Sequence, residues 1–393
     1  MPRVVIIGGG PAGINCAQAL AQQLTAADDT EVLLLEKSAF YYHAVGAPRA
    51  YVDADFVRKL FVPYDDAIPK AAAGFVRVLR AVATRISANE SEVSYRTIDA
   101  DDKESETTET LRFDFLILAT GSTYTTPIKQ DGRDPTRSTT EAQMQEVHGQ
   151  IEKANKILVV GGGAVGCEVA GEIKAKYPTK SVTILEARDK LIATNNLCDK
   201  FYSYLDHALG KLKIEVILGE RLEVRLEGNC FEKRTLRTDK GTAIESDIQL
   251  LCGGFHPATA LVQDMDASLV TDRGAIKVND QLQLAGKKHE HVFALGDATD
   301  HTTPKLAYWA GEQGKFLARE LVAVIRKKQE GFTTPFPKVT AEALILPLGP
   351  RGGVSQLPVW GGLVFGDWVT WLVKARDMFA GKTWSSFGAA IPN

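Results

Sequence analysis

One unit of sequence occurs twice in this chain, and this repeat constrains the fold more than any other feature. The first copy is VVIIGGGPAGINCAQALAQQL followed by EVLLLEK, and the second is ILVVGGGAVGCEVAGEIKAKY followed by SVTILEAR. Each copy has a β-branched apolar run, then G-x-G-x-x-G, an Ala-rich helical stretch, and a second apolar run that ends in Glu. The repeat predicts two βαβ dinucleotide-binding units of the Rossmann type.

Each glycine of the motif has its own physical role. The first permits a tight turn, the second lets a pyrophosphate approach the backbone, and the third allows helix and strand to pack closely. The helix N-terminus offers N–H groups to phosphates, and the acid that ends the second strand accepts hydrogen bonds from a ribose. A lone motif can be a simple glycine turn, but two in this context predict two dinucleotides. The candidate residues are Gly8, Gly9, Gly10, Pro11, Ala12, Gly13, Glu36, Lys37, Gly161, Gly163, Gly166 and Glu186.

The length and charge of the chain set further limits. With 393 residues it is long enough for two or three domains. Its hydrophobic content of 45% and charged content of 24% are those of an ordinary globular protein. The net charge of −3 gives no reason to expect nucleic-acid binding. From Lys315 onward, however, ten Lys or Arg outweigh five Asp or Glu, which favours an anionic partner for the C-terminal segment.

Cysteine spacing and hydropathy exclude several classes. No C-x-x-C pair occurs, which argues against a disulfide framework, a zinc site and a dithiol redox centre, and favours a reducing compartment such as the cytoplasm. No metal site is expected. The opening MPRVVIIGGG is too short for a membrane span and lacks a signal-peptide pattern, and no run of about 18 apolar residues follows. Pro2 excludes N-myristoylation of this sequence, while a removed leader stays open.

Two further segments resemble those that complete the FAD domain of two-dinucleotide flavoprotein reductases. FDFLILATGST contains Thr120 and Gly121, and HVFALGDATD contains Asp297. In that family the Asp reaches the ribityl or pyrophosphate region of FAD, although such an acid alone can equally be a turn or helix-cap residue. The resemblance implies an α/β protein with an FAD domain at 1–123 and 248–328, an inserted NAD(P)H domain at 124–247, and a small C-terminal α+β domain at 329–393.

Two acids of the second copy are expected to contact the bound NAD(P)H. Glu168 lies in the first turn of the helix, where a Glu in this superfamily can approach the nicotinamide or its ribose. The alternative is an acid favoured only by the helix dipole. The carboxylate of Glu186 repels a 2′-phosphate, and Arg188 softens that discrimination. NADH is therefore the expected donor, with NADPH tolerated.

The stretch from Thr302 to Lys328 predicts a helix with Pro304 at its first position. By the same resemblance, its N-terminus points at the pyrimidine edge of the flavin. Lys305 would then help to stabilise negative charge on the reduced flavin. The alternative is a solvent-exposed lysine in the first turn.

The chain also resembles the ferroptosis suppressor proteins, or AIF-like mitochondrion-associated inducers of death, which share the general design of type II NADH dehydrogenases. The resemblance spans nearly the whole chain and rests on FYYHAVGAPRA, LILATGST, GGGAVGCEVAGEIKAKYP, ALGDATDHTTPKLAYWAG and KARDMF. It implies an FAD-dependent NAD(P)H:quinone oxidoreductase that reduces ubiquinone-like lipids in an antioxidant role. It also implies that Arg49 and the Val82 backbone contact FAD, that His43 lies near the flavin, and that Lys374 and Phe379 line the path to the quinone. His43 could alternatively be a polar loop residue.

Other functions remain open at this stage. Without a C-x-x-x-x-C or C-x-x-C segment a dithiol acceptor is not expected, which leaves a quinone, a small redox protein or oxygen. A reductase of a soluble redox protein would need an electrostatic docking patch, and a flavin-bearing signalling protein would oxidise NADH only incidentally. The expected partners are a lipid-soluble quinone and a membrane or lipid-droplet surface, with no nucleic acid. The chain is expected to be a monomer or homodimer, peripheral on a cytoplasmic membrane face.

The stretch WGGLVFGDWVTWLVKARDMF, from Trp360 to Phe379, holds three of the five tryptophans. On a helical wheel from Leu363 to Phe379, an apolar arc of roughly 120° faces a narrow polar stripe. Asp367 and the glycines argue against a spanning helix. We therefore expect one side to pack over the flavin and the other to meet lipid, where Trp favours the interface. Pure core packing is the alternative.

Overall fold

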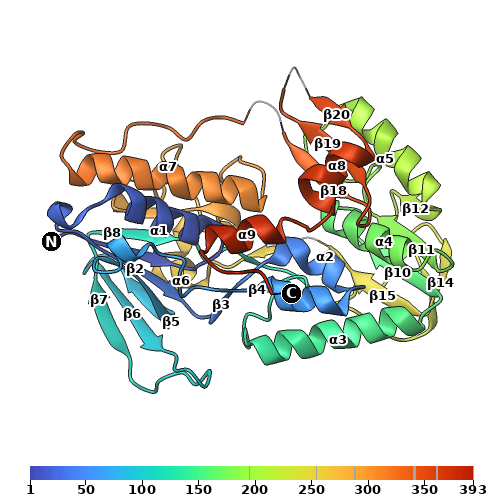
Figure 1. The fold of residues 1–393 in the computed structure, drawn as a ribbon, viewed down its shortest axis with the longest axis horizontal. Coiled ribbons are helices and arrows are strands. Elements are labelled where there is room, and N and C mark those ends of the chain that lie inside the picture. Colours follow the sequence, from blue (N-terminus) through green and yellow to red (C-terminus); the bar gives the residue numbers. More distant parts are fainter. Residues whose placement is uncertain (194, 254, 287–288, 340–341, 360–361, 393) are drawn as a thin grey trace.

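The computed structural model describes residues 1–393 except 194, 254, 287–288, 340–341, 360–361 and 393, so Trp360 of the C-terminal stretch lies outside the described residues. The two predicted parallel-sheet units lie side by side, and the C-terminal elements reach from the second unit across to the first (Figure 1). The expected α/β class and the small C-terminal α+β part are both present.

The first unit is built on a seven-stranded sheet in the order β17-β8-β1-β2-β5-β6-β7. Its central strands are parallel and almost wholly apolar because both faces of the sheet are buried, one under two helices and the other mainly under Ile86, Val93, Tyr95 and Val262. Helix α1 (Pro11–Gln23) packs along α7 (Ala307–Ile325) on one face. The strands are β1 (Arg3–Ile7), β2 (Glu31–Glu36), β5 (Val76–Ser87), β6 (Glu92–Thr97), β7 (Glu109–Arg112), β8 (Phe115–Leu118) and β17 (Val292–Ala294).

The second unit has a four-stranded parallel sheet in the order β12-β11-β10-β15. The strands are β10 (Lys156–Val160), β11 (Ser181–Glu186), β12 (Ile214–Leu218) and β15 (Ile248–Leu251), and the helices are α3 (Arg137–Lys153), α4 (Ala164–Lys176) and α5 (Asp199–Lys211). A hairpin of β13 (Arg234–Arg237) and β14 (Ala243–Ser246) adjoins the sheet.

The expected domain boundary after residue 247 lies one strand too early. β15 pairs in parallel with β10, so residues 248–251 belong to the sheet of the second unit. The chain returns to the first unit through β16 (His256–Pro257), which pairs with β9 (Ser122–Thr123). These two short strands carry the chain between the units in opposite directions.

Shorter elements connect the units. The first unit also contains β3 (Phe40–Tyr42), β4 (Phe61–Pro63), α2 (Ala47–Ala50) and α6 (Ala260–Met265). The C-terminal part consists of an antiparallel sheet of β18 (Leu344–Pro347), β19 (Gly353–Leu357) and β20 (Leu363–Phe365), then α8 (Asp367–Thr370), a π-helical turn (Trp371–Ala375) and α9 (Ala380–Ser386).

The continuous helix expected from Leu363 to Phe379 is wrong. Residues 363–365 form an edge strand on β19, and Gly366 separates them from α8. The helical run ends after Ala375, and Met378 and Phe379 have positive φ angles of 52° and 63°. A three-residue apolar run carries no helical periodicity of its own, so pairing with β19 decided its structure.

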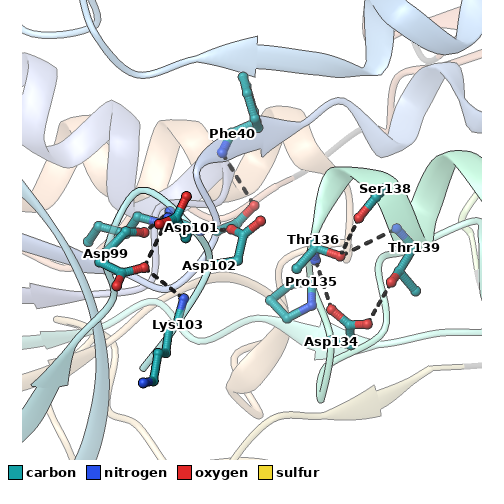
Figure 2. A network of polar contacts seen from close by, with 12 residues as sticks. Phe40, Asp99, Asp101, Asp102, Lys103, Asp134, Pro135, Thr136, Ser138 and Thr139 are labelled. Carbon is teal, nitrogen blue, oxygen red and sulfur yellow. Dashed lines mark hydrogen bonds and ion pairs between the residues drawn. The ribbon is translucent and has the colours of Figure 1, made fainter. Parts of the chain in front are cut away.

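Outside the sheets, side-chain hydrogen bonds to backbone amides stabilise turns and helix ends. Figure 2 shows the Asp99 carboxylate accepting hydrogen bonds from the amides of Asp101 and Lys103, which tightens an exposed turn. Figure 2 also shows the start of α3, where the Thr136 hydroxyl accepts from the amide of Thr139. This N-cap satisfies one of the free N–H groups of the helix.

Candidate active site

The first glycine-rich turn has a packed side and an open side. A Cβ built on Gly8 would lie 2.4 Å from the carbonyl oxygen of Ala119, and one on Gly13 would lie 1.9 Å from that of Gly8. Nothing lies within 4 Å of a Cβ built on Gly10. The outer glycines are therefore required by packing, and the middle one borders open space at the N-terminus of α1, which begins at Pro11.

The second turn repeats these contacts. A Cβ on Gly161 would lie 2.4 Å from the Cys252 carbonyl oxygen, and one on Gly166 would lie 1.9 Å from the Gly161 oxygen. Gly163 again has nothing within 4 Å. The same cradle therefore stands at the start of α4, and each cradle fits a pyrophosphate.

The two terminal acids take equivalent positions. Glu36 Oε2 accepts a hydrogen bond of 2.5 Å from the amide of Gly9, and Glu186 Oε2 accepts one of 2.7 Å from the amide of Gly162. Each carboxylate thus lies beside its glycine turn at the end of the second strand, where a ribose diol would bind. Lys37 Nζ instead donates to the carbonyl oxygen of Gly132, 2.5 Å away.

Asp297 lies beside β9, the strand through which the chain leaves the first unit. It follows β17, and its Oδ2 accepts a hydrogen bond of 2.7 Å from Ser122 Oγ. The Thr120 hydroxyl donates to the carbonyl oxygen of Ala258, and Gly121 has a φ of +69°. Lys129 Nζ lies 3.1 Å from Asp297 Oδ2. Lys129 lies in an irregular loop with no motif around it, so no sequence signal indicated its role.

The helix that carries Lys305 begins later than expected. α7 starts at Ala307, with Leu306 as its N-cap, so Pro304 is not the first helical residue. Lys305 Nζ donates to the carbonyl oxygens of His301 (3.1 Å) and Gly296 (3.3 Å), and burial lowers the pKa of this amine. The alternative of a solvent-exposed lysine in the first turn is wrong, since the amine points into the 296–301 loop.

Glu168 and Lys374 form a buried ion pair. Lys374 Nζ lies 2.7 Å from Glu168 Oε1, and the two side chains are only 11% and 7% exposed, respectively. Burial raises the pKa of Glu168, and the neighbouring Lys374 ammonium opposes that shift. The Phe379 ring centroid is 6.0 Å from the same ammonium. Glu168, Lys374 and Phe379 therefore gather where α4 meets the C-terminal segment, whereas Lys305 lies in the 296–301 loop.

A second buried pair joins the units beside it. Arg49, on α2, donates to both carboxylate oxygens of Glu172 on α4, at 2.6 and 2.8 Å, and to the carbonyl oxygen of Ala375 at 2.7 Å. The predicted FAD contact of Arg49 is thus accompanied by an interdomain role that the sequence did not indicate. The one sequence signal is the four-residue spacing of Glu168 and Glu172, which places both acids on one face of α4.

His43 is buried and anchors the turn at Met378. Its Nε2 lies 2.8 Å from the Met378 carbonyl oxygen, and its Nδ1 lies 3.2 Å from the Thr383 hydroxyl. Burial lowers the pKa of this imidazole to about 4, so the ring is neutral at pH 7 and Nε2 donates to the carbonyl. His43 lies in the short connection after β3, so it is a polar loop residue, although a buried one, and its position near the flavin stays a prediction.

Val82 lies on β5 just beyond the residue that pairs with the end of β2. Arg80 is paired with Glu36, and Val82 with Arg96 of β6. Val82 therefore lies two residues after the partner of Glu36 in the sheet. Its predicted FAD contact stays a prediction. Among the described residues, no group of three or more His, Cys, Asp or Glu side chains is arranged to hold a metal ion.

The geometry agrees with comparisons to known proteins. The family model described as pyridine nucleotide-disulphide oxidoreductase matches residues 2–314. Ferroptosis suppressor protein 1 of Homo sapiens is 30% identical over 392 residues, covering 99% of this chain and 96% of its own length. Apoptosis-inducing factor homolog B of Dictyostelium discoideum is 29% identical over 394 residues, with 96% and 94% covered.

Solved structures share the fold. The water-forming NADH oxidase from Lactobacillus brevis bound to NADH aligns with a TM-score of 0.63 at 20% identity, covering 91% of this chain and 75% of that chain. A NAD-dependent persulfide reductase from A. fulgidus aligns with a TM-score of 0.65 at 20% identity, covering 90% and 63%. With two dinucleotide cradles, a family match over residues 2–314 and homologues among the ferroptosis suppressor proteins, this chain belongs to the pyridine nucleotide-disulphide oxidoreductase family and is a flavin-dependent NAD(P)H oxidoreductase that uses FAD.

Proposed function

We propose that the chain is an FAD-dependent NAD(P)H:quinone oxidoreductase whose acceptor is a lipid-soluble, ubiquinone-like quinone. The observation that carries this proposal is the buried contact between Lys374 and Glu168. It joins the nicotinamide-side helix α4 to a C-terminal segment whose opposite side exposes large apolar residues. An acceptor that approaches from an apolar phase would therefore meet the site through this segment.

The reaction balances with one added proton. NAD(P)H, a proton and the quinone give NAD(P)⁺ and the quinol, so two electrons and two protons reach the acceptor. FAD supplies the redox group that accepts hydride and passes electrons on. The Lys374–Glu168 pair supplies a buried, hydrogen-bonded proton site near the acceptor path. Phe379, beside the same ammonium, offers an aromatic wall for a quinone ring.

We assign NADH as the preferred donor, with NADPH tolerated. The Glu186 carboxylate already accepts amide hydrogen bonds from Gly162 and Arg188, at 2.7 and 2.9 Å, and is held beside the second glycine turn. A 2′-phosphate placed there would meet this negative charge, whereas a ribose diol would donate hydrogen bonds to it. Arg188 provides the nearby positive charge that leaves NADPH usable.

The proposal includes a peripheral position on a cytoplasmic membrane face. Trp368 is 71% exposed, and Trp371, Leu372 and Val373 beside it are also exposed. Trp side chains favour the membrane–water interface, where ring and N–H meet different surroundings. Among the described residues, no helix is long and apolar enough to cross a bilayer.

The test is a comparison of acceptors with purified, FAD-loaded protein. Fast NADH oxidation with a short-chain ubiquinone, and slower oxidation with NADPH, is the expected result. Preference for a soluble iron–sulfur protein over every quinone would favour a redox-protein reductase. Slow turnover with every acceptor, together with a long-lived complex of NADH and flavin, would favour a signalling protein and overturn the proposal.

A matched pair of variants separates the site from the fold. Lys374→Met removes the buried ammonium at the wall of the acceptor path, and Lys382→Met alters an exposed lysine nearby. We expect quinone turnover to fall strongly in the first variant and to stay unchanged in the second. FAD content, read from the flavin absorbance, serves as the measure of folding for both.

A further inference from the structure

Helix α5 of the second unit has three chemically distinct sides. Its buried side consists of Phe201, Leu205 and Leu209. At about 100° per residue, a second side gathers cationic and aromatic side chains, and the third gathers acids. The second side consists of the exposed residues Lys200, Tyr204, His207 and Lys211, and the third includes the exposed Asp199 and Asp206. Opposite charges on this helix are therefore separated.

The cationic side adjoins the exposed apolar residues of the C-terminal segment. A Tyr204 ring carbon lies 3.7 Å from a Cβ position built on Gly366, and Lys211 Nζ lies 3.4 Å from Asp367 Oδ2. The Lys200 ammonium lies 5.8 Å from the centroid of the Tyr204 ring. Figure 1 shows α5 running beside β20 and α8. Trp368 follows directly, so the two exposed groups form one continuous surface.

We infer that this surface, called here the α5–tail face, binds the headgroup layer of an anionic phospholipid bilayer. It consists of Lys200, Tyr204, His207, Lys211, Trp368, Trp371, Leu372 and Val373. The inference deepens the proposed function, on which it rests, by naming the lipid class and by adding the NAD(P)H unit to the contact.

The basic and aromatic side chains of the α5–tail face favour an anionic membrane surface. The exposed lysines of the face are Lys200 and Lys211, and the Asp367 carboxylate beside them is already paired with Lys211. Basic side chains beside exposed tryptophans are the combination that anionic membrane surfaces attract. The acids of α5 point away from this face, so repulsion of lipid phosphates stays small.

This docking would orient the active site. Val373 points outward and its neighbour Lys374 points inward to Glu168, so one π-helical turn has the face on one side and the buried pair on the other. π-helical turns often occur at functional sites because the extra residue redirects side chains. A quinone dissolved in the bilayer would thus enter beside the turn that holds Lys374.

The test uses full-length, FAD-loaded protein and sedimentation with phosphatidylcholine vesicles, with and without phosphatidylserine. Lys200→Gln combined with Tyr204→Ser should weaken binding to the phosphatidylserine vesicles by about fivefold or more, since each basic residue near such a surface contributes about that factor. Raised salt should reduce the difference between the vesicles. Lys153→Gln, an exposed lysine on α3 at the other side of the molecule, is the matched control and should bind like the parent.

Two outcomes would overturn the inference. One is unchanged binding of the α5 double variant to phosphatidylserine vesicles, and the other is no preference of the parent for them. Turnover with a short-chain quinone in the absence of vesicles is measured in parallel. If that turnover fails while vesicle binding persists, the proposed quinone chemistry fails and the docking surface stands, so the two conclusions are tested separately.

Discussion

The interdomain pair of Arg49 and Glu172 gives the sharpest energetic prediction. The two side chains are 7% and 1% exposed, and the guanidinium makes three hydrogen bonds, two of them to the Glu172 carboxylate. Glu172→Ala leaves a buried cation that keeps one of its three hydrogen bonds, the one to the Ala375 carbonyl. Removal of one member of a buried pair costs about 3–5 kcal/mol. Since the free energy of unfolding of a folded protein is about 5–15 kcal/mol, we expect this variant to lose about a fifth of it or more.

The double variant Arg49→Met/Glu172→Met tests the cause. It removes both charges and keeps apolar volume, so the remaining cost is the Ala375 carbonyl without its donor, about 1–3 kcal/mol. Urea unfolding of the FAD-loaded protein, followed by tryptophan and flavin fluorescence, measures all variants at one pH. The double variant should be more stable than Glu172→Ala.

If the double variant loses as much stability as Arg49→Met and Glu172→Met together, the two residues act independently and the buried ion pair is not the cause of the loss. An exposed pair provides the control. Lys156 Nζ and Glu245 Oε2 are 2.7 Å apart, yet both side chains are more than half exposed. Glu245→Ala should leave the unfolding midpoint unchanged, since solvent screens such pairs.

Three further predictions follow from the site. Between pH 6.5 and 4 the parent should lose about 3 kcal/mol more stability than His43→Asn. The pKa of the buried imidazole is lowered to about 4, so the unfolded chain takes up the proton first as the pH falls. An equal dependence of the unfolding free energy on pH in both proteins would contradict this. Gly163→Ala should fold normally and raise KM for NADH severalfold, whereas Gly166→Ala should not yield folded protein, as circular dichroism would report. Glu186→Gln should raise the ratio of NADPH to NADH kcat/KM about tenfold, equivalent to about 1.4 kcal/mol, and an unchanged ratio would remove Glu186 from donor selection.

The sequence predicted the features that depend on short stretches of chain. The glycine spacing required a strand, a turn and a helix in each unit, and the packing at Gly13 and Gly166 leaves no room for a side chain. Resemblance to flavoprotein reductases also assigned the A-T-G segment and Asp297 to one FAD domain, and the structure places them beside each other. β8 and β17 are parallel neighbours, so whatever follows each strand meets at the same edge of the sheet.

The tertiary structure alone decided how the three parts meet. Lys374 reaches Glu168 across 206 residues, and His43 reaches the Met378 carbonyl across 335. No periodicity in the sequence records such contacts, because each partner is an ordinary polar residue in its own segment. The C-terminal stretch became strand, short helix and strained turn for the same reason: β19, His43 and Arg49 hold its backbone groups, and these partners come from distant parts of the chain. Local sequence fixed the two dinucleotide cradles, and long-range packing built the buried pair between them.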